Sequence, residues 1–260
     1  MLLFDALTAA HPFLWPAFFG IVLYGVRYLA IAGVMYLLVA PARAGGWGRA
    51  LPGIPPGFDA RQHAGRELRH SLVTILVFGL VNGILYSCGL IGASLLYFRP
   101  EDHPVWWFWL SIPLMFMLHD TLFYWLHRLM HLPRLFGTMH RVHHRSIHPT
   151  AFAAYSFHPT EALAEALIVT AIIFIIPVHP LAFLIFQTLS TVYNVYGHCG
   201  REFYPEGMSA HWLGRWINTS TAHAVHHLKG RMNYGLYFMF WDRVMHTAET
   251  SAPDTAARTG

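Results

Sequence analysis

The stretch from residue 119 to residue 131 reads HDTLFYWLHRLMH and continues an apolar segment that begins at Val105. His127 and His131 are four positions apart, so in a helix they share one face. The pattern predicts one helix from Val105 to His131 that is apolar at its start and carries two imidazoles at its end. We therefore expect an all-α protein in which a membrane helix ends at a ligand pair.

Two further clusters repeat this spacing. Residues 140–144 read HRVHH and residues 223–227 read HAVHH. Positions i, i+3 and i+4 lie on one helix face, and imidazole is a good ligand for iron, zinc, copper and nickel. Eight such ligands are too many for one metal ion and suit two. A pH-sensing histidine surface is the main alternative, and it would not require the repeated spacing.

Other candidates extend this site. His198 is a candidate ninth ligand, and His158 is equally compatible with a ligand and with a helix cap. Asp120 shares the helix face of His127 and is expected to accept the far N–H of a ligand imidazole, a role that Glu161 and Asp242 also suit. The remaining histidines are expected to be structural or solvated, and His119, which points away from His127, is disfavoured as a ligand. The metal-ligand candidates are His127, His131, His140, His143, His144, His198, His223, His226 and His227, with His158 less certain.

The composition points to a membrane protein. Of 260 residues, 55% are hydrophobic and only 12% are charged, against about 25% charged in an ordinary soluble domain. Disorder is excluded and a soluble globular protein is disfavoured. Two cysteines cannot form a disulfide framework, a cysteine-bound iron–sulfur cluster or a four-cysteine zinc site. The net charge is +4 without a basic run, so no nucleic-acid partner is expected.

Apolar segments divide the chain. We expect about four to five transmembrane or re-entrant helices, in one structural unit with a cytoplasmic helical cap that holds the histidine clusters. The segments 161–176 and 181–196 form a hairpin that either spans the membrane or is re-entrant, since each is short for a full crossing. The predicted spans and regions are spans at 13–39, 71–98 and from 105, a polar loop at 40–70, N-terminal helices at 1–118, a catalytic region at 119–247 containing the hairpin 161–196, and a flexible tail at 248–260.

The basic residues predict an orientation. The arginines of 40–70, those of 128–158 and the basic residues after 198 all fall on one side under this topology. By the positive-inside rule that side is cytoplasmic. Abundant arginine with almost no lysine favours a bacterial inner membrane over the endoplasmic reticulum, which would be the location in a eukaryote.

The motifs HDTLFYWLHRLMH, HRVHH, SFHPTE, HCGREFYP, HAVHH and NYGLYFMFWDRVMHT, in this order over about residues 119–247, resemble the fatty acid hydroxylase/sterol desaturase superfamily. The resemblance implies an integral membrane non-haem di-iron enzyme that uses O2 and two external electrons to hydroxylate or desaturate a lipid. It implies that the eight clustered histidines and His198 bind two iron ions, with zinc as a substitute in a purified sample. The first motif, HxxxH, favours the sterol desaturase branch over the acyl hydroxylases.

The expected partners follow from the same resemblance. They are a membrane lipid, O2 and a separate electron donor, either a ferredoxin or a cytochrome b5-like protein with its reductase, because the chain shows no dinucleotide fingerprint and no cysteine cluster. Four arginines near the clusters could dock an acidic donor or equally bind lipid headgroups: Arg134, Arg141, Arg145 and Arg231.

Two alternative functions remain at this stage. A histidine-rich metal transporter would need paired polar groups within the spans, and these are nearly absent. A zinc-dependent lipid hydrolase would use three protein ligands, far fewer than are present. The lipid itself (sterol-like, acyl or sphingoid) and the choice between hydroxylation and desaturation stay open.

Overall fold

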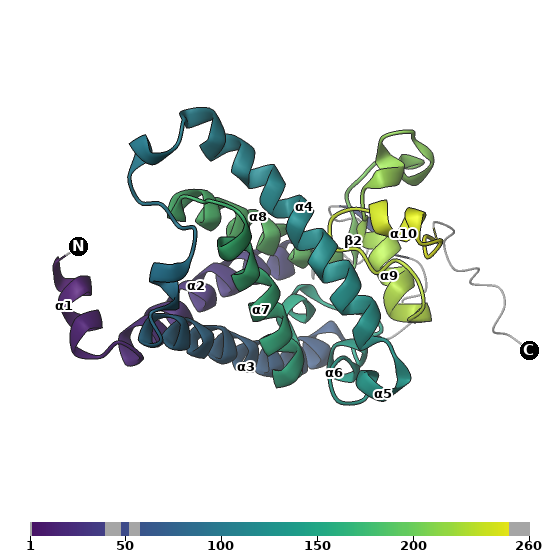
Figure 1. The fold of residues 1–260 in the computed structure, drawn as a ribbon. Coiled ribbons are helices and arrows are strands. Elements are labelled where there is room, and N and C mark those ends of the chain that lie inside the picture. Colours follow the sequence, from purple (N-terminus) through teal and green to yellow (C-terminus); the bar gives the residue numbers. More distant parts are fainter. Residues whose placement is uncertain (1, 40–47, 52–57, 250–260) are drawn as a thin grey trace, which may run out of the picture.

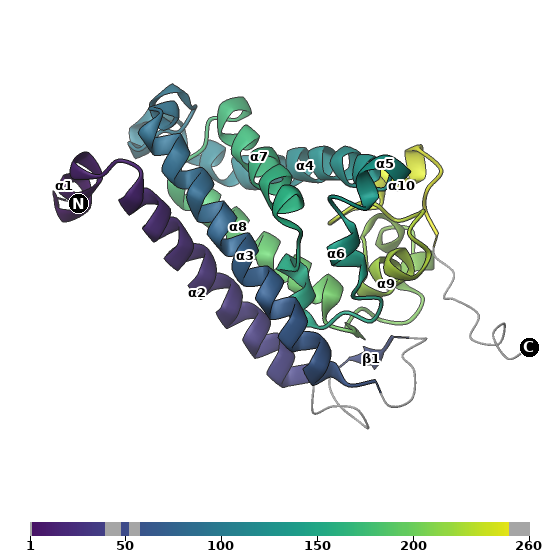
Figure 2. The same cartoon turned by 90° about the horizontal axis from the view of Figure 1, so that it is seen from below.

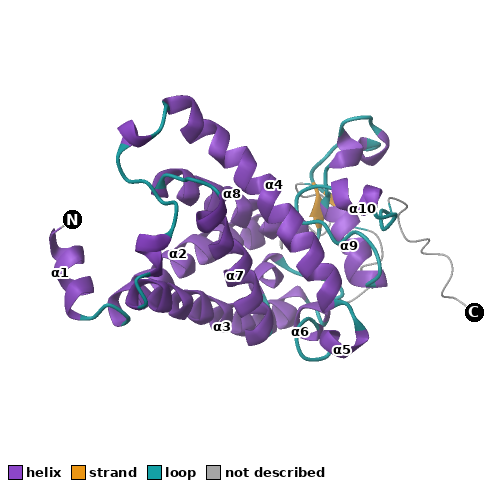
Figure 3. Cartoon of the chain, viewed as in Figure 1, coloured by secondary structure: helices purple, strands orange, loops and turns teal. Residues whose placement is uncertain are grey.

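The computed structural model describes residues 2–39, 48–51 and 58–249, and this part of the chain is mostly helical (Figures 1 and 3). Within it, two helices are long and apolar enough to cross a membrane, α2 (Leu14–Val39) and α3 (Ala60–Ser87). A short helix, α1 (Leu2–Ala10), precedes them. The all-α prediction holds for these residues and fits a membrane protein. Of the predicted flexible tail, residues 250–260 lie outside the described residues.

Helices α2 and α3 lie side by side and run antiparallel (Figure 2). Glycines allow this close approach. A Cβ atom at Gly79 would lie 2.8 Å from the carbonyl oxygen of Ala17, and one at Gly83 would lie 2.8 Å from that of Phe13. Any larger side chain at these positions would force the two backbones apart.

The second apolar helix is displaced from its prediction. We expected it at 71–98, after a polar loop, but α3 begins at Ala60 and ends at Ser87. Asp59 caps its start by accepting from the backbone N–H of Arg61 at 2.9 Å. Gly89, with a φ of 68°, adopts the left-handed conformation that commonly ends a helix. The polar segment before residue 71 is therefore partly helix, and the residues after Ser87 form a turn and a short 3-10 helix, Leu90–Ala93.

The third apolar helix agrees with its prediction. Helix α4 runs Val105–Met130, and His131 is its C-cap. Trp106 and Trp109 at its start are 61% and 62% exposed. Exposed aromatic rings at a helix entry are typical of a membrane interface.

The predicted apolar hairpin consists of α7 (Pro159–Ile175) and α8 (Pro180–His198), which both contact α4 (Figure 1). They contain 17 and 19 residues, or about 26 and 29 Å, close to the roughly 30 Å of a hydrocarbon core. The ends of α4 and α8 carry histidines predicted as metal ligands, and the start of α7 carries Glu161, so these three ends define the location of the site.

Short elements gather at this same end of the long helices (Figure 2). The two strands pair antiparallel, with Arg49 opposite Glu202. The elements are α5 (Pro133–Phe136), α6 (Arg141–His144), α9 (Ser220–Lys229), α10 (Phe240–Val244), β1 (Arg49–Ala50) and β2 (Arg201–Glu202).

Buried contacts join the membrane-length helices to this layer through a 3-10 helix at Ala151–Tyr155. Tyr28 of α2 stacks on Tyr155 with ring centroids 4.3 Å apart, and its hydroxyl donates to the carbonyl of Phe152 at 2.7 Å. The buried carboxylate of Glu67 accepts from the hydroxyl and backbone N–H of Thr150. These contacts fix the segment that follows HRVHH and so help to position that motif.

Candidate metal centre

Nine imidazoles converge where α4 and α8 end, beside the start of α7. They form two groups, and within each group the nearest ligand atoms all lie within 4.8 Å of one another. The first group is His127, His131, His140, His144 and His226, and the second is His143, His198, His223 and His227. All nine histidines were candidates on sequence grounds, and the structure brings every one of them into a group.

Four segments build the two groups. The end of α4 and the end of α8 each serve one group, whereas the two HxxHH motifs are divided between both. In α9, His223 and His227 face one group and His226 faces the other. Residues three and four apart lie at different angles around a helix, so a single HxxHH turn can serve two neighbouring ions. The rings of His144 and His227, one from each group, have centroids 4.9 Å apart, so the groups are adjacent.

Backbone carbonyls set the tautomers of three imidazoles. The Nδ1 atoms of His127, His198 and His226 lie 2.8, 2.7 and 2.7 Å from the carbonyl oxygens of Tyr234, Asn194 and Met232. A carbonyl oxygen only accepts, so each Nδ1 carries the proton and each Nε2 keeps its lone pair.

Glu161 does the same for a fourth imidazole. Its carboxylate oxygen lies 2.6 Å from Nδ1 of His140, and both side chains are buried. This is the role expected of Glu161. A carboxylate on the far side of a ligand imidazole orients the ring and raises its basicity as a ligand.

Two of these imidazoles point their lone pairs at each other. Nε2 of His127 lies 2.9 Å from Nε2 of His140, and both rings carry their proton on Nδ1. Nε2 of His144 lies similarly close to Nε2 of His226, at 3.0 Å. A second proton does not relieve the repulsion between His127 and His140 at neutral pH, because burial holds the pKa of His140 well below its usual value. A cation that binds neutral imidazole does relieve it, so the donor set fits a transition metal ion in each group.

Asp120 differs from its prediction. It contacts no imidazole of either group, and one of its oxygens instead accepts from the backbone N–H groups of Leu236, Tyr237 and Phe238 at 2.7–3.2 Å. This carboxylate oxygen accepts from three backbone N–H groups of one turn, in place of the imidazole N–H that was predicted. Asp120 therefore acts on the loop that carries the carbonyl partner of His127.

Asp242 holds the same loop. Its two oxygens accept from the backbone N–H groups of Tyr234 and Gly235 at 2.9 and 2.8 Å. The Tyr234 carbonyl in turn accepts from His127. Both aspartates thus support the site by accepting from backbone N–H groups. The prediction that they accept from an imidazole N–H is wrong for both.

His119 and His158 lie outside both groups. Nδ1 of His119 is 2.8 Å from the hydroxyl of Tyr237, in the interior behind the site. His158 is the N-cap of α7, where its Nδ1 accepts from the backbone N–H of Thr160. Of the two roles open to His158, the structure shows the helix cap.

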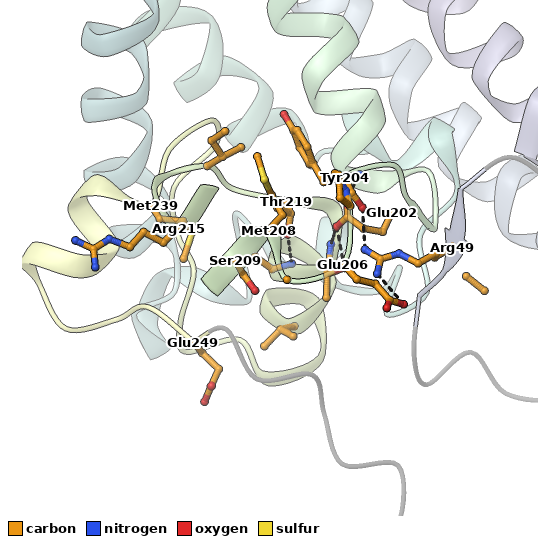
Figure 4. Close-up of a pocket in the computed structure, with 17 residues that line it drawn as sticks. Arg49, Glu202, Tyr204, Glu206, Met208, Ser209, Arg215, Thr219, Met239 and Glu249 are labelled. Carbon is orange, nitrogen blue, oxygen red and sulfur yellow. Dashed lines mark hydrogen bonds and ion pairs between the residues drawn. The ribbon is translucent and has the colours of Figure 1, made fainter. Parts of the chain in front are cut away.

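A polar cavity of about 350 Å³ lies on the other side of α9 (Figure 4). Thr221 of α9 lines it and donates to Glu202, and Arg49 pairs with Glu206 at 3.1 Å. None of the nine clustered histidines lines this cavity. It is therefore separate from the metal centre.

Fold and site together define a helical protein with two adjacent imidazole groups at one end of membrane-length helices. The chain belongs to the fatty acid hydroxylase family, whose model matches residues 112–247. That range contains all nine clustered histidines. The resemblance seen in the motifs is thereby confirmed.

The proteins to which the chain is similar include sterol desaturases and a sterol oxidase. The chain is 30% identical to lathosterol oxidase of Mus musculus over 71% of its own length and 60% of that protein. It is 26% identical to a Delta(7)-sterol 5(6)-desaturase of Gibberella zeae, over 73% of the chain and 57% of that protein. The match to a Delta(7)-sterol 5(6)-desaturase of Aspergillus fumigatus is 29% identical, over 87% and 62%. The chain thus spans less than two thirds of these relatives. No solved structure matches it.

Proposed function

We propose that this protein is an O2-dependent membrane di-iron oxidase that hydroxylates or desaturates an unactivated C–H bond of a sterol-like lipid. The observation that carries the proposal is the pair of adjacent imidazole groups whose Nε2 lone pairs converge. The relatives named above as desaturases and as an oxidase support oxidation as the reaction class.

Iron is the metal that this reaction class favours. Imidazole also binds zinc, but zinc has no redox chemistry. Two bound iron ions would supply the O2 activation that no amino-acid side chain provides. The nine clustered imidazoles would hold them, five in one group and four in the other.

The chain's own residues would orient the site and keep it dry. Glu161 holds His140, and Asp120 and Asp242 hold the loop that orients His127. Most of the nine imidazoles are buried, which limits side reactions with water. The apolar helices α4, α7 and α8 end at the site, so a lipid would reach it from the bilayer and not from the aqueous side.

We propose that the metal centre lies on the cytoplasmic side of the membrane. The support is the distribution of the basic residues along the chain together with the positive-inside rule. The excess of arginine over lysine favours a bacterial inner membrane, whereas the eukaryotic relatives favour the endoplasmic reticulum. On the cytoplasmic side an acidic ferredoxin or a cytochrome b5-like protein would supply the two electrons that O2 reduction requires.

Four exposed arginines border the site and are the proposed docking surface for this donor: Arg134, Arg141, Arg145 and Arg231. Changing all four to Glu should slow reduction of the metal ions by an acidic donor by about tenfold or more at low salt, since opposite charges accelerate encounter. Stopped-flow reduction kinetics would measure it, with small-molecule dithionite as the control reductant. Unchanged kinetics with the protein donor would reject this surface.

The direct test of the proposed function is a metal count on protein purified anaerobically in mild detergent. We expect about two iron ions per chain in the native protein, one for each group. The double variant His143→Ala, His226→Ala removes one imidazole from each group and should lose most of the iron. His158→Ala, which changes a histidine outside the groups, should keep it. One zinc ion per chain with no iron would reject a di-iron oxidase and favour a zinc hydrolase.

A further inference from the structure

A charged side chain, that of Arg27, lies near the middle of the membrane-length helix α2. The Nη2 atom of Arg27 donates to Oε1 of Gln187 at 3.3 Å, and its guanidinium carbon lies 5.0 Å from the centroid of the Tyr24 ring. No carboxylate of the described residues forms an ion pair with it. Ionisable groups inside a membrane are costly and usually mark a functional site.

Gln187 of α8 is held in one orientation by this contact. Because Oε1 faces the guanidinium, the amide nitrogen Nε2 points away from Arg27. Gln187 is 7% exposed, and its Nε2 is buried without a hydrogen-bond partner. A buried donor without a partner destabilises the fold, so a site that keeps one is expected to gain a partner from outside.

Gln187 lines a cavity of about 150 Å³ between α2, α3, α7 and α8. The rest of the lining is mainly apolar, and its other polar residues are Tyr24, Asn82 and Thr170. An apolar cavity of about 150 Å³ is large enough for one six-membered ring. The cavity therefore suits the end of a hydrocarbon skeleton that carries one hydrogen-bond acceptor.

We propose that this cavity binds the oxygen-bearing end of the lipid substrate, with Gln187 donating to that oxygen and Arg27 fixing the amide. The oxygen belongs to a hydroxyl, ketone or carboxyl group, which all accept. This inference rests on the proposed function, because it assigns one end of the same lipid. Gln187 and Arg27 are thus specificity-determining residues of a subsite remote from the metal ions.

The cavity and the imidazole groups are separated along α8. Gln187 and His198 are eleven residues apart on this helix, or about 16 Å along its axis. A lipid whose oxygen is bound at Gln187 would have to extend over this distance to bring a C–H bond to the imidazole groups.

The test is equilibrium binding to the full-length metal-loaded protein in nanodiscs without an electron donor, so that no turnover occurs. The probes are two matched pairs, 5α-cholestan-3β-ol against 5α-cholestane and stearic acid against octadecane. The oxygenated member of at least one pair should bind about tenfold more tightly than its hydrocarbon, as one buried hydrogen bond predicts. The responding pair identifies the source of the oxygen.

Variants connect this preference to the cavity. Gln187→Leu should abolish the difference within the responding pair, and Arg27→Met should reduce it by freeing the amide to rotate. Thr188→Val, a change one residue away at a position that does not line the cavity, should leave it intact. Equal binding within both pairs, or an unchanged preference in Gln187→Leu, would overturn the proposal. Because binding is measured without turnover, a protein that proves not to be an oxidase would leave this result interpretable.

Discussion

The contact between Glu161 and His140 makes a prediction at the scale of single residues. Glu161→Gln keeps the size of the side chain but removes the charge that accepts from Nδ1 of His140. Loss of such a carboxylate typically weakens metal affinity about 10- to 100-fold. We expect a loss in that range, measured as iron retained during a chelator titration.

Glu165→Gln is the matched control for this variant. Glu165 lies one helical turn away on α7 and is also buried, but no hydrogen bond among the described residues joins it to an imidazole of either group. It should retain iron as the native protein does. Equal iron loss in both variants would mean that general disturbance of α7, and not the carboxylate on His140, is responsible.

Residue by residue, the sequence predicted the imidazoles but not what orients them. Eight of the nine clustered histidines were predicted from their i, i+3 and i+4 spacing, and His198 from its place after the apolar hairpin and from the family resemblance. The sequence could not predict which carbonyl groups orient the imidazoles, because every residue carries a carbonyl and only the tertiary fold selects three of them. These are the carbonyls of Met232, Asn194 and Tyr234. Asp120 was assigned to an imidazole because helical spacing cannot show a competing turn from a distant part of the chain.

At the scale of elements, the contact between α2 and α3 depends on glycine. In Gly79→Ala the new Cβ would lie 2.8 Å from the carbonyl oxygen of Ala17. The helices must separate, and overpacking of this kind costs about 1–3 kcal/mol. We expect a clearly lower melting temperature, measured by differential scanning fluorimetry in detergent.

Gly65→Ala in the same helix provides the comparison. A Cβ at Gly65 meets nothing within 4 Å. Alanine is favoured over glycine in a helix by about 1 kcal/mol, so this variant should melt at the native temperature or above it. If Gly79→Ala were as stable as Gly65→Ala, close packing of α2 on α3 would not be limiting.

The elements also show where hydropathy fails. Helices at 14–39, 105–130, 159–175 and 180–198 match the apolar segments closely. The exception is α3, whose first eleven residues, 60–70, were assigned to a polar loop. Several of those residues, including Arg61, Gln62 and Arg69, are exposed, whereas buried Glu67 bonds Thr150. Hydropathy indicates which residues contact lipid. It cannot detect a helix that continues beyond the apolar segment into polar sequence.

At the scale of the whole molecule, the metal ions would join segments that are far apart in the chain. The two groups combine α4, α6, α8 and α9, from His127 to His227. The sequence predicted that two ions would be needed but not how each HxxHH motif is shared, because that depends on how α6 and α9 face each other. Both ions would contact α6 and α9 because each HxxHH motif is divided between the groups, so both should stabilise one cooperative unit.

Metal removal should therefore lower the stability of the entire fold. A ligand that binds only the folded state at a hundredfold excess over its Kd adds about 2.7 kcal/mol. Dialysis against a chelator should lower the melting temperature by several degrees, and added ferrous iron under anaerobic conditions should restore it. The shift should vanish in the His143→Ala, His226→Ala variant and persist in His158→Ala. Identical melting of loaded and metal-free protein would show instead that the imidazole groups are held together by the helices alone.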